Sequence, residues 1–114
     1  MGRAWLAAAP PAEREDALLR LRELDDGAWP RIAAGVARAR EDAASLGICC
    51  SFGEWQDGVN AIATSFRPGG GLPMMVLNVG APAFVCSTES LLDEARPALL
   101  ALARSLDGVL DRPN

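Results

Sequence analysis

The chain has 114 residues, enough for one domain with a single core, and half of them are apolar. Its formal charge is −4 and all eleven basic residues are arginines spread along the chain, so we expect no concentrated basic face for the DNA backbone. Histidine and lysine are absent, which excludes Ser-His and Cys-His dyads, histidine-ligated zinc, Schiff-base chemistry and a P-loop. Without an apolar run long enough for a membrane span or a signal peptide, the sequence predicts a cytoplasmic protein.

The first half predicts three helices. An alanine-rich helix over residues 2–9 stops at two prolines, and a second helix covers residues 12–24 before an Asp-Asp-Gly break. A third helix starts near Trp29–Pro30, because proline suits a first helical turn. Gly47 is placed to end it in the left-handed conformation. Its apolar residues repeat every three or four positions and predict one buried stripe: Ile32, Val36, Ala39, Ala43 and Leu46.

The second half predicts an antiparallel sheet. Residues 48–52 and 59–66 read as strands, and a glycine-rich hairpin at 67–71 leads to a continuously apolar strand over 74–79. That continuity predicts that both faces of the last strand are covered, and Gly80-Ala81-Pro82 should end it. Three strands leave unpaired edges, so either a partner subunit covers them or the chain is part of something longer.

A closing helix follows the strands. Ser87 offers its cap, Pro97 predicts a kink or a late start, and the residues from Asp107 onward predict a frayed polar tail. The apolar positions of this helix repeat at helical spacing: Leu92, Ala95, Leu99, Leu102 and Leu106.

Enzyme chemistry finds little support. The three cysteines include an adjacent pair, which argues against a disulfide framework. Glu54 and Asp57 flank Trp55 in a loop, a carboxylate pair of the kind glycosidases use, but most loop acids are only solvated. An enzyme built on Cys50 or Glu54 would lack histidine and lysine to assist it. We therefore predict no enzyme, no catalytic residue, no metal and no cofactor.

A family resemblance rests on the order of motifs from Gly47 to Phe84. These are Gly-X-Cys-X-Ser-X-Gly-Glu-Trp, then Gly-Val-Asn-Ala-Ile-Ala at 58–63, a glycine-rich hairpin, and Leu-Asn-Val-Gly-Ala-Pro-Ala-Phe at 77–84. Together they resemble the effector-binding domain of IclR-type transcriptional regulators, and residues 2–8 and 31–47 resemble helices of that domain. The resemblance implies an α/β (α+β) fold in which an antiparallel sheet is flanked by helices, as in GAF-like domains. Residues 1–114 would be its C-terminal portion, and DNA would be reached only through a missing N-terminal helix-turn-helix domain.

The resemblance also implies an effector site. Backbone N–H groups at the helix start, Met1-Gly2, would hold a carboxylate, since helix N-termini favour anions. Side-chain contacts would come from Ser51 and from two residues of each later strand. Their mostly apolar character favours an aromatic or aliphatic acid, although the later-strand valines and Leu77 would serve equally well as core. Those strand positions are Val59, Ala61, Leu77 and Val79; Asn78 alternates to the opposite face, where a structural hydrogen bond is expected.

Two functions remain open. The first is the organic-acid-sensing domain of a bacterial IclR-type regulator, in which effector binding changes the arrangement of a dimer or tetramer and thereby DNA binding. The second is a stand-alone GAF-like oligomerisation module that binds no effector.

Overall fold

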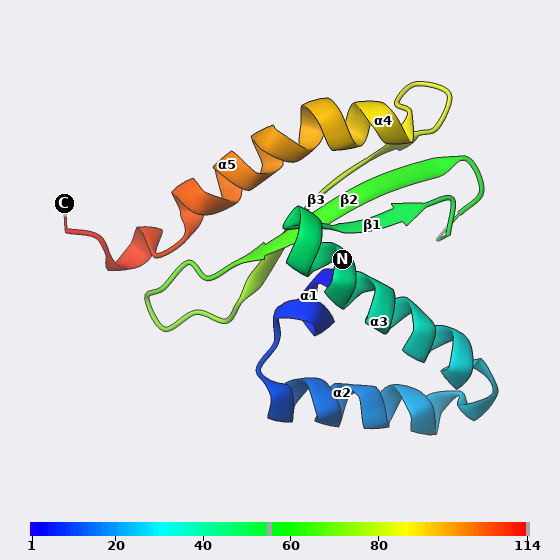
Figure 1. The fold of residues 1–114 in the computed structure, drawn as a ribbon. Helices are drawn as coiled ribbons and strands as arrows, with labels where there is room; N and C mark the ends of the chain where they lie inside the picture. Colours follow the sequence, from blue (N-terminus) through cyan, green and yellow to red (C-terminus); the bar gives the residue numbers. More distant parts are fainter. Residues whose placement is uncertain (55, 114) are drawn as a thin grey trace.

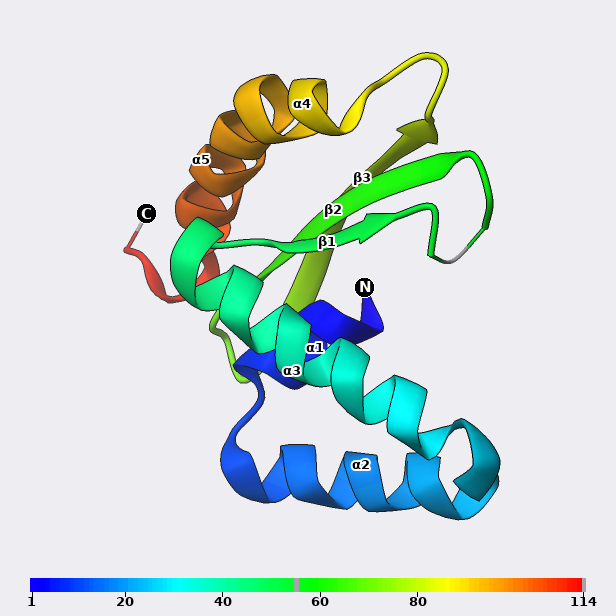
Figure 2. The ribbon, with the colours of Figure 1, turned by 45° about the vertical axis from the view of Figure 1, so that its right-hand side comes forward.

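An antiparallel sheet lies between two helical layers in the computed structural model, which describes residues 1–54 and 56–113 (Figure 1). One layer holds α4 (Thr88–Ser90), a π-helical turn (Leu91–Ala95) and α5 (Arg96–Leu106); the other holds α1 (Gly2–Ala8) and α3 (Trp29–Leu46). The turned view keeps the same order of layers (Figure 2). The predicted α+β class is confirmed, while Trp55, which closes the first motif of the family resemblance, lies outside the described residues.

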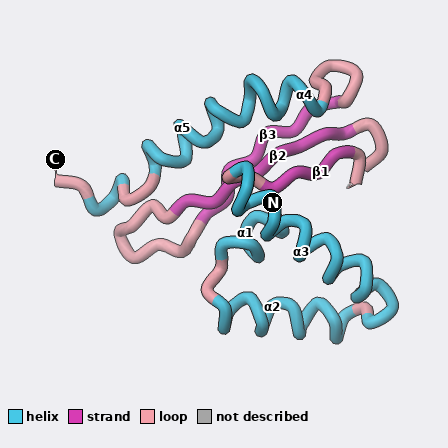
Figure 3. Tube along the Cα trace, viewed as in Figure 1, coloured by secondary structure: helices cyan, strands magenta, loops and turns pink. Residues whose placement is uncertain are grey.

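The sheet has the order β1-β2-β3, with both neighbouring pairs antiparallel. Its strands are Cys49–Phe52, Val59–Phe66 and Met75–Pro82, and they form one group between the helices in Figure 3. β3 does not end at Gly80 as predicted, because Gly80 and Ala81 pair with Ala61 and Asn60 and continue the ladder. The prediction that both faces of β3 are covered is also wrong: Met75 is 41% and Val79 37% exposed. α1 and α5 pack mainly on the central strand and leave the edge strand open.

α1 owes its position to small side chains. Ala4 and Ala9 are buried, and so little volume lets the helix approach both α3 and the sheet closely. α3 begins with Pro30 in its first turn and ends at Gly47, whose φ of 77° confirms the predicted left-handed terminator. The Thr64 hydroxyl of β2 donates a hydrogen bond of 2.9 Å to the Gly47 carbonyl, which fixes the helix end on the sheet.

α2 (Pro11–Leu24) stands apart from the sheet in both ribbon views. None of its residues is buried, and Leu24 is 82% exposed. A 3₁₀ turn (Asp26–Ala28) joins it to α3, capped by the Asp25 carboxylate, which accepts a hydrogen bond from the Ala28 N–H. Arg22 stacks over Trp29, with its guanidinium 5.8 Å from the ring centre. Within the described residues, no helix combines the length and the apolar run of a membrane span.

The closing helix is capped as predicted, with the Ser90 N–H donating to the Ser87 hydroxyl. Pro97 lacks an N–H and clashes with the preceding turn in a regular helix, and the π turn before it accommodates this. α5 therefore starts late, at Arg96. The π turn also rotates the buried stripe: Leu91, Leu99 and Ala103 are buried, whereas Leu102, predicted on the stripe, is 49% exposed.

Residues 107–111 do not belong to the frayed tail that the sequence had predicted. The Asp107 carboxylate accepts from the Arg67 N–H at 2.7 Å, and the Asp111 carboxylate accepts from the Gly70 N–H at 2.8 Å. Two backbone bonds, from Gly108 to the Arg67 carbonyl and from Leu110 to the Pro68 carbonyl, complete the contact. A last 3₁₀ turn (Val109–Asp111) thus binds the glycine-rich β2–β3 connection, a contact that local composition did not predict.

Candidate functional site

Cross-strand register decides which side chains share a face of the sheet. Residues directly opposite each other on neighbouring strands point to the same side. Cys49 pairs with Ala63 and Ala63 with Asn78, while Ser51 pairs with Ala61 and Ala61 with Gly80. Since Cys49 and Ala63 pack against Ala4 of α1, all these positions lie on the face that α1 covers.

A small cavity of about 40 Å³ lies on this face, where α1 begins. Met1, Ser51 and Ala61, three of the predicted effector residues, line it together. Arg3 and Asn78 line it as well, and neither was among the predicted effector residues. The cavity therefore joins one cationic and two neutral polar side chains above a floor of small residues.

Leu77 and Val79 do not share this surface. Leu77 packs against the cluster built around Ile62 and Leu99, and Val79 pairs directly with Ile62, so both point toward α5. The prediction that they line one floor with Ala61 is wrong, because a shift of one residue in a strand exchanges its two faces. The Asn78 residue is exposed and its side chain makes no hydrogen bond with the described residues, so the predicted structural bond of this side chain is absent as well. A polar side chain within an otherwise apolar strand was the sequence feature that could have indicated Asn78 as a cavity residue.

Val59 and Gly2 lie beside the cavity rather than in it. Val59 shares the face of Ala61 by alternation but pairs with Pro82 at the far end of the ladder. Gly2 borders a separate groove between α1 and α3. The first turn of α1 is closed by a hydrogen bond from the Trp5 N–H to the Met1 carbonyl.

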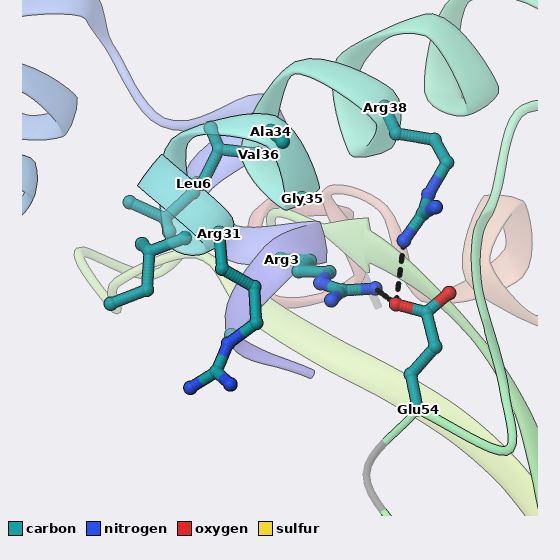
Figure 4. Close-up of a pocket in the computed structure, with 10 residues that line it drawn as sticks. Arg3, Leu6, Arg31, Ala34, Gly35, Val36, Arg38 and Glu54 are labelled. Atoms are coloured by element: carbon teal, nitrogen blue, oxygen red, sulfur yellow. Dashed lines mark hydrogen bonds and ion pairs between the residues drawn. The ribbon is translucent and has the colours of Figure 1, made fainter. Parts of the chain in front are cut away.

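The groove between α1 and α3 is larger, about 740 Å³, and is charged. Arg3, Arg31, Arg38 and Glu54 line it (Figure 4). Arg3 and Arg38 both donate to the same Glu54 oxygen, Oε2, at 2.5 and 2.6 Å. Glu54 thus connects the loop after β1 to α1 and α3.

The buried cysteines are poorly suited to nucleophilic chemistry. Burial raises the pKa of the Cys50 thiol from 9.0 to about 11, and the Asp42 carboxylate adds to the effect. Burial and Asp42 raise the pKa of Cys49 in the same way. Because the thiolate is the reactive form, both groups are inert thiols at neutral pH.

Comparisons with known proteins support the reading of the fold. No protein-family model and no curated protein matches the chain. Among solved structures, it is similar to an IclR family transcriptional regulator from Brucella abortus, with a TM-score of 0.84 and 36% sequence identity over 92% of this chain. The chain has the fold of part of an IclR-family regulator.

The chain spans only 39% of the Brucella protein. It also resembles a chain from Rhodococcus sp. RHA1 described as a transcriptional regulator, with a TM-score of 0.73 and 28% identity over 97% of this chain and 46% of that one. Both similar proteins are described as transcriptional regulators.

Proposed function

We propose that the chain is the small-molecule-sensing part of a cytoplasmic IclR-type regulator and is not itself an enzyme. Its effector would be a small organic acid bound under α1. The observation that carries the proposal is the cavity that places Met1, Arg3, Ser51 and Asn78 around one point on the sheet. A guanidinium with two neutral polar groups on an otherwise apolar floor is the chemistry that holds and orients a carboxylate.

The size of the cavity narrows the ligand class. A water needs roughly 10–15 Å³ of such space, so about 40 Å³ suits a carboxylate with a short chain. An aromatic acid, which the apolar strand residues suggested, would require α1 to move away from the sheet. We therefore place short aliphatic acids before aromatic ones.

Movement of α1 is also the proposed route to regulation. α1 packs on α3 and on the sheet, so an acid that favours one position of α1 would favour one position of α3. In a dimer or tetramer, that shift would change the arrangement of the subunits and of the DNA-binding domains of a longer regulator. Residues 1–114 would then be the C-terminal portion of the effector-binding domain.

Thermal-shift measurements test this proposal. Acetate, butyrate and benzoate are compared with chloride at equal ionic strength, for the unaltered chain and for the Ser51→Ala, Asn78→Ala and Ser65→Ala variants. We expect a saturable rise in Tm with a short acid, lost in the first two variants and kept in Ser65→Ala, which lies on β2 outside the cavity. Equal responses of the three variants, or none beyond that to chloride, would contradict the proposal.

The second candidate is a stand-alone oligomerisation module without effector. It is favoured by α2, which buries none of its residues and exposes Leu19 and Leu24. Size-exclusion chromatography with light scattering separates the two functions: a stable homo-oligomer that no acid stabilises favours the module.

A further inference from the structure

The groove between α1 and α3 carries a cluster of charged side chains, most of which do not line the effector cavity. Its lining contains three guanidiniums, from Arg3, Arg31 and Arg38, and one carboxylate, from Glu54. The charged lining therefore sums to +2, on a chain whose formal charge is −4. We propose that this groove is a second binding site, for a phosphate dianion, either free or as the end group of a small monoester.

The geometry of Glu54 supports an oxyanion at this position. A single carboxylate oxygen accepts hydrogen bonds from Arg3 and Arg38 at 2.5 and 2.6 Å, the arrangement in which guanidiniums bind phosphate oxygens. Glu54 is carried by a loop rather than by the sheet, and its side chain is 31% exposed. A phosphate oxygen can take the place of Oε2 while Glu54 turns outward into solvent.

Arg3 is held ready for such a ligand. A Cβ at Gly35 of α3 would lie 3.0 Å from its Nη2 and 3.2 Å from its Nε, so the bare backbone there lets the guanidinium lie flat against the helix. Fixing the guanidinium before binding lowers the entropy lost when the ligand arrives.

Arg31 supplies the positive charge that no carboxylate in the described part of the chain neutralises. It lines the groove from the first turn of α3, and its side chain forms no ion pair or hydrogen bond with any described residue (Figure 4). Once Glu54 has turned outward, the three guanidiniums of the lining attract the doubly charged phosphate near neutral pH more strongly than a singly charged carboxylate. With about 740 Å³, the groove also accepts the remainder of a small monoester.

Isothermal titration of the 114-residue chain at pH 7.5 tests the site, with inorganic phosphate and glycerol 2-phosphate as probes and sodium chloride holding ionic strength constant. We expect saturable one-to-one binding that Arg31→Gln and Arg38→Gln each weaken about tenfold, the loss typical of one charge-assisted hydrogen bond. Glu54→Gln should tighten binding, because it removes the competing carboxylate. Tighter binding of glycerol 2-phosphate than of inorganic phosphate would indicate that the organic part of the monoester also contacts the groove.

Arg40→Gln is the matched control, since Arg40 is an exposed α3 arginine outside the groove. Its binding should equal that of the unaltered chain. Phosphate heats no greater than those of chloride, or equal weakening by Arg40→Gln and Arg31→Gln, would overturn the proposal. The Arg31 side chain forms no ion pair or hydrogen bond with the residues that the structure describes, so Arg31→Gln should leave the fold intact and tests the site even if Glu54→Gln is unstable. Arg3 lines both sites, but the three substituted groove residues lie outside the cavity under α1, so loss of phosphate binding in Arg31→Gln with an unchanged Tm response to short acids distinguishes the two proposals.

Discussion

The two faces of the sheet are built from different residues for different purposes. Toward α5, large branched side chains close a continuous core around Ile48, Ile62, Leu91 and Leu99. Toward α1 and α3, the core consists of Ala4, Ala39, Cys49 and Ala63, and cavities open beside it. Alternate residues of one strand, β2, serve both faces. Strand alternation therefore puts the large buried side chains on the α5 face and the cavity proposed for the effector on the α1 face.

The largest expected effect tests the closed face. Ile62→Ala removes a fully buried side chain and should cost about 3 kcal/mol of unfolding free energy, because the core around it cannot collapse completely. Its neighbour Ala63→Gly, on the open face, should cost only about 1 kcal/mol. Urea denaturation with equal m-values measures both. Equal losses of unfolding free energy in the two variants would mean that the two faces of the sheet contribute equally to stability.

We expect Ala61→Leu to lower the stability less than Ile62→Ala does, but to abolish the binding of short acids. The larger side chain enters the cavity under α1 and should cost about 1–2 kcal/mol while abolishing any rise in Tm with short acids. Ala81→Leu is the control, because Ala81 pairs with Asn60 and points to the opposite face. Acid-induced stabilisation that survives in Ala61→Leu would place the ligand elsewhere.

The smallest effect concerns Cys50, which packs on the closed face. Its folded pKa of about 11 lies above the ordinary 9.0, so folding favours the protonated thiol. This contribution to stability is complete below pH 9 and is lost as the pH rises through 11. Iodoacetamide labelling with peptide mapping should show slow reaction at pH 8 in the native chain and fast reaction in urea. Equal rates at pH 8 would show that Cys50 is not protected by burial.

Local patterns predicted the helices and β2 well, because capping and breaking residues such as Gly47 and Ser87 act within a few positions. The phase of β3 relative to β2 could not be predicted. Both faces of these strands carry apolar residues, so alternation in the sequence does not say whether Leu77 or Asn78 faces α1. The Arg3–Glu54 contact joins residues 51 positions apart, and only the folded chain brings them together.

The hydrogen bonds between the last 3₁₀ turn and the β2–β3 connection hold this end of the sheet in place. Three consecutive glycines with positive φ favour a flexible turn. The carboxylates of Asp107 and Asp111, about forty positions further along the chain, accept hydrogen bonds from the Arg67 and Gly70 amides and restrain this connection. A side chain at Gly69 would collide with the Asp111 carboxylate, so only glycine at this position lets the Asp111 carboxylate reach the connection. The amide protons of Arg67 and Gly70 should consequently exchange with solvent as slowly as those of a strand, and clipping the last eight residues would release both at once.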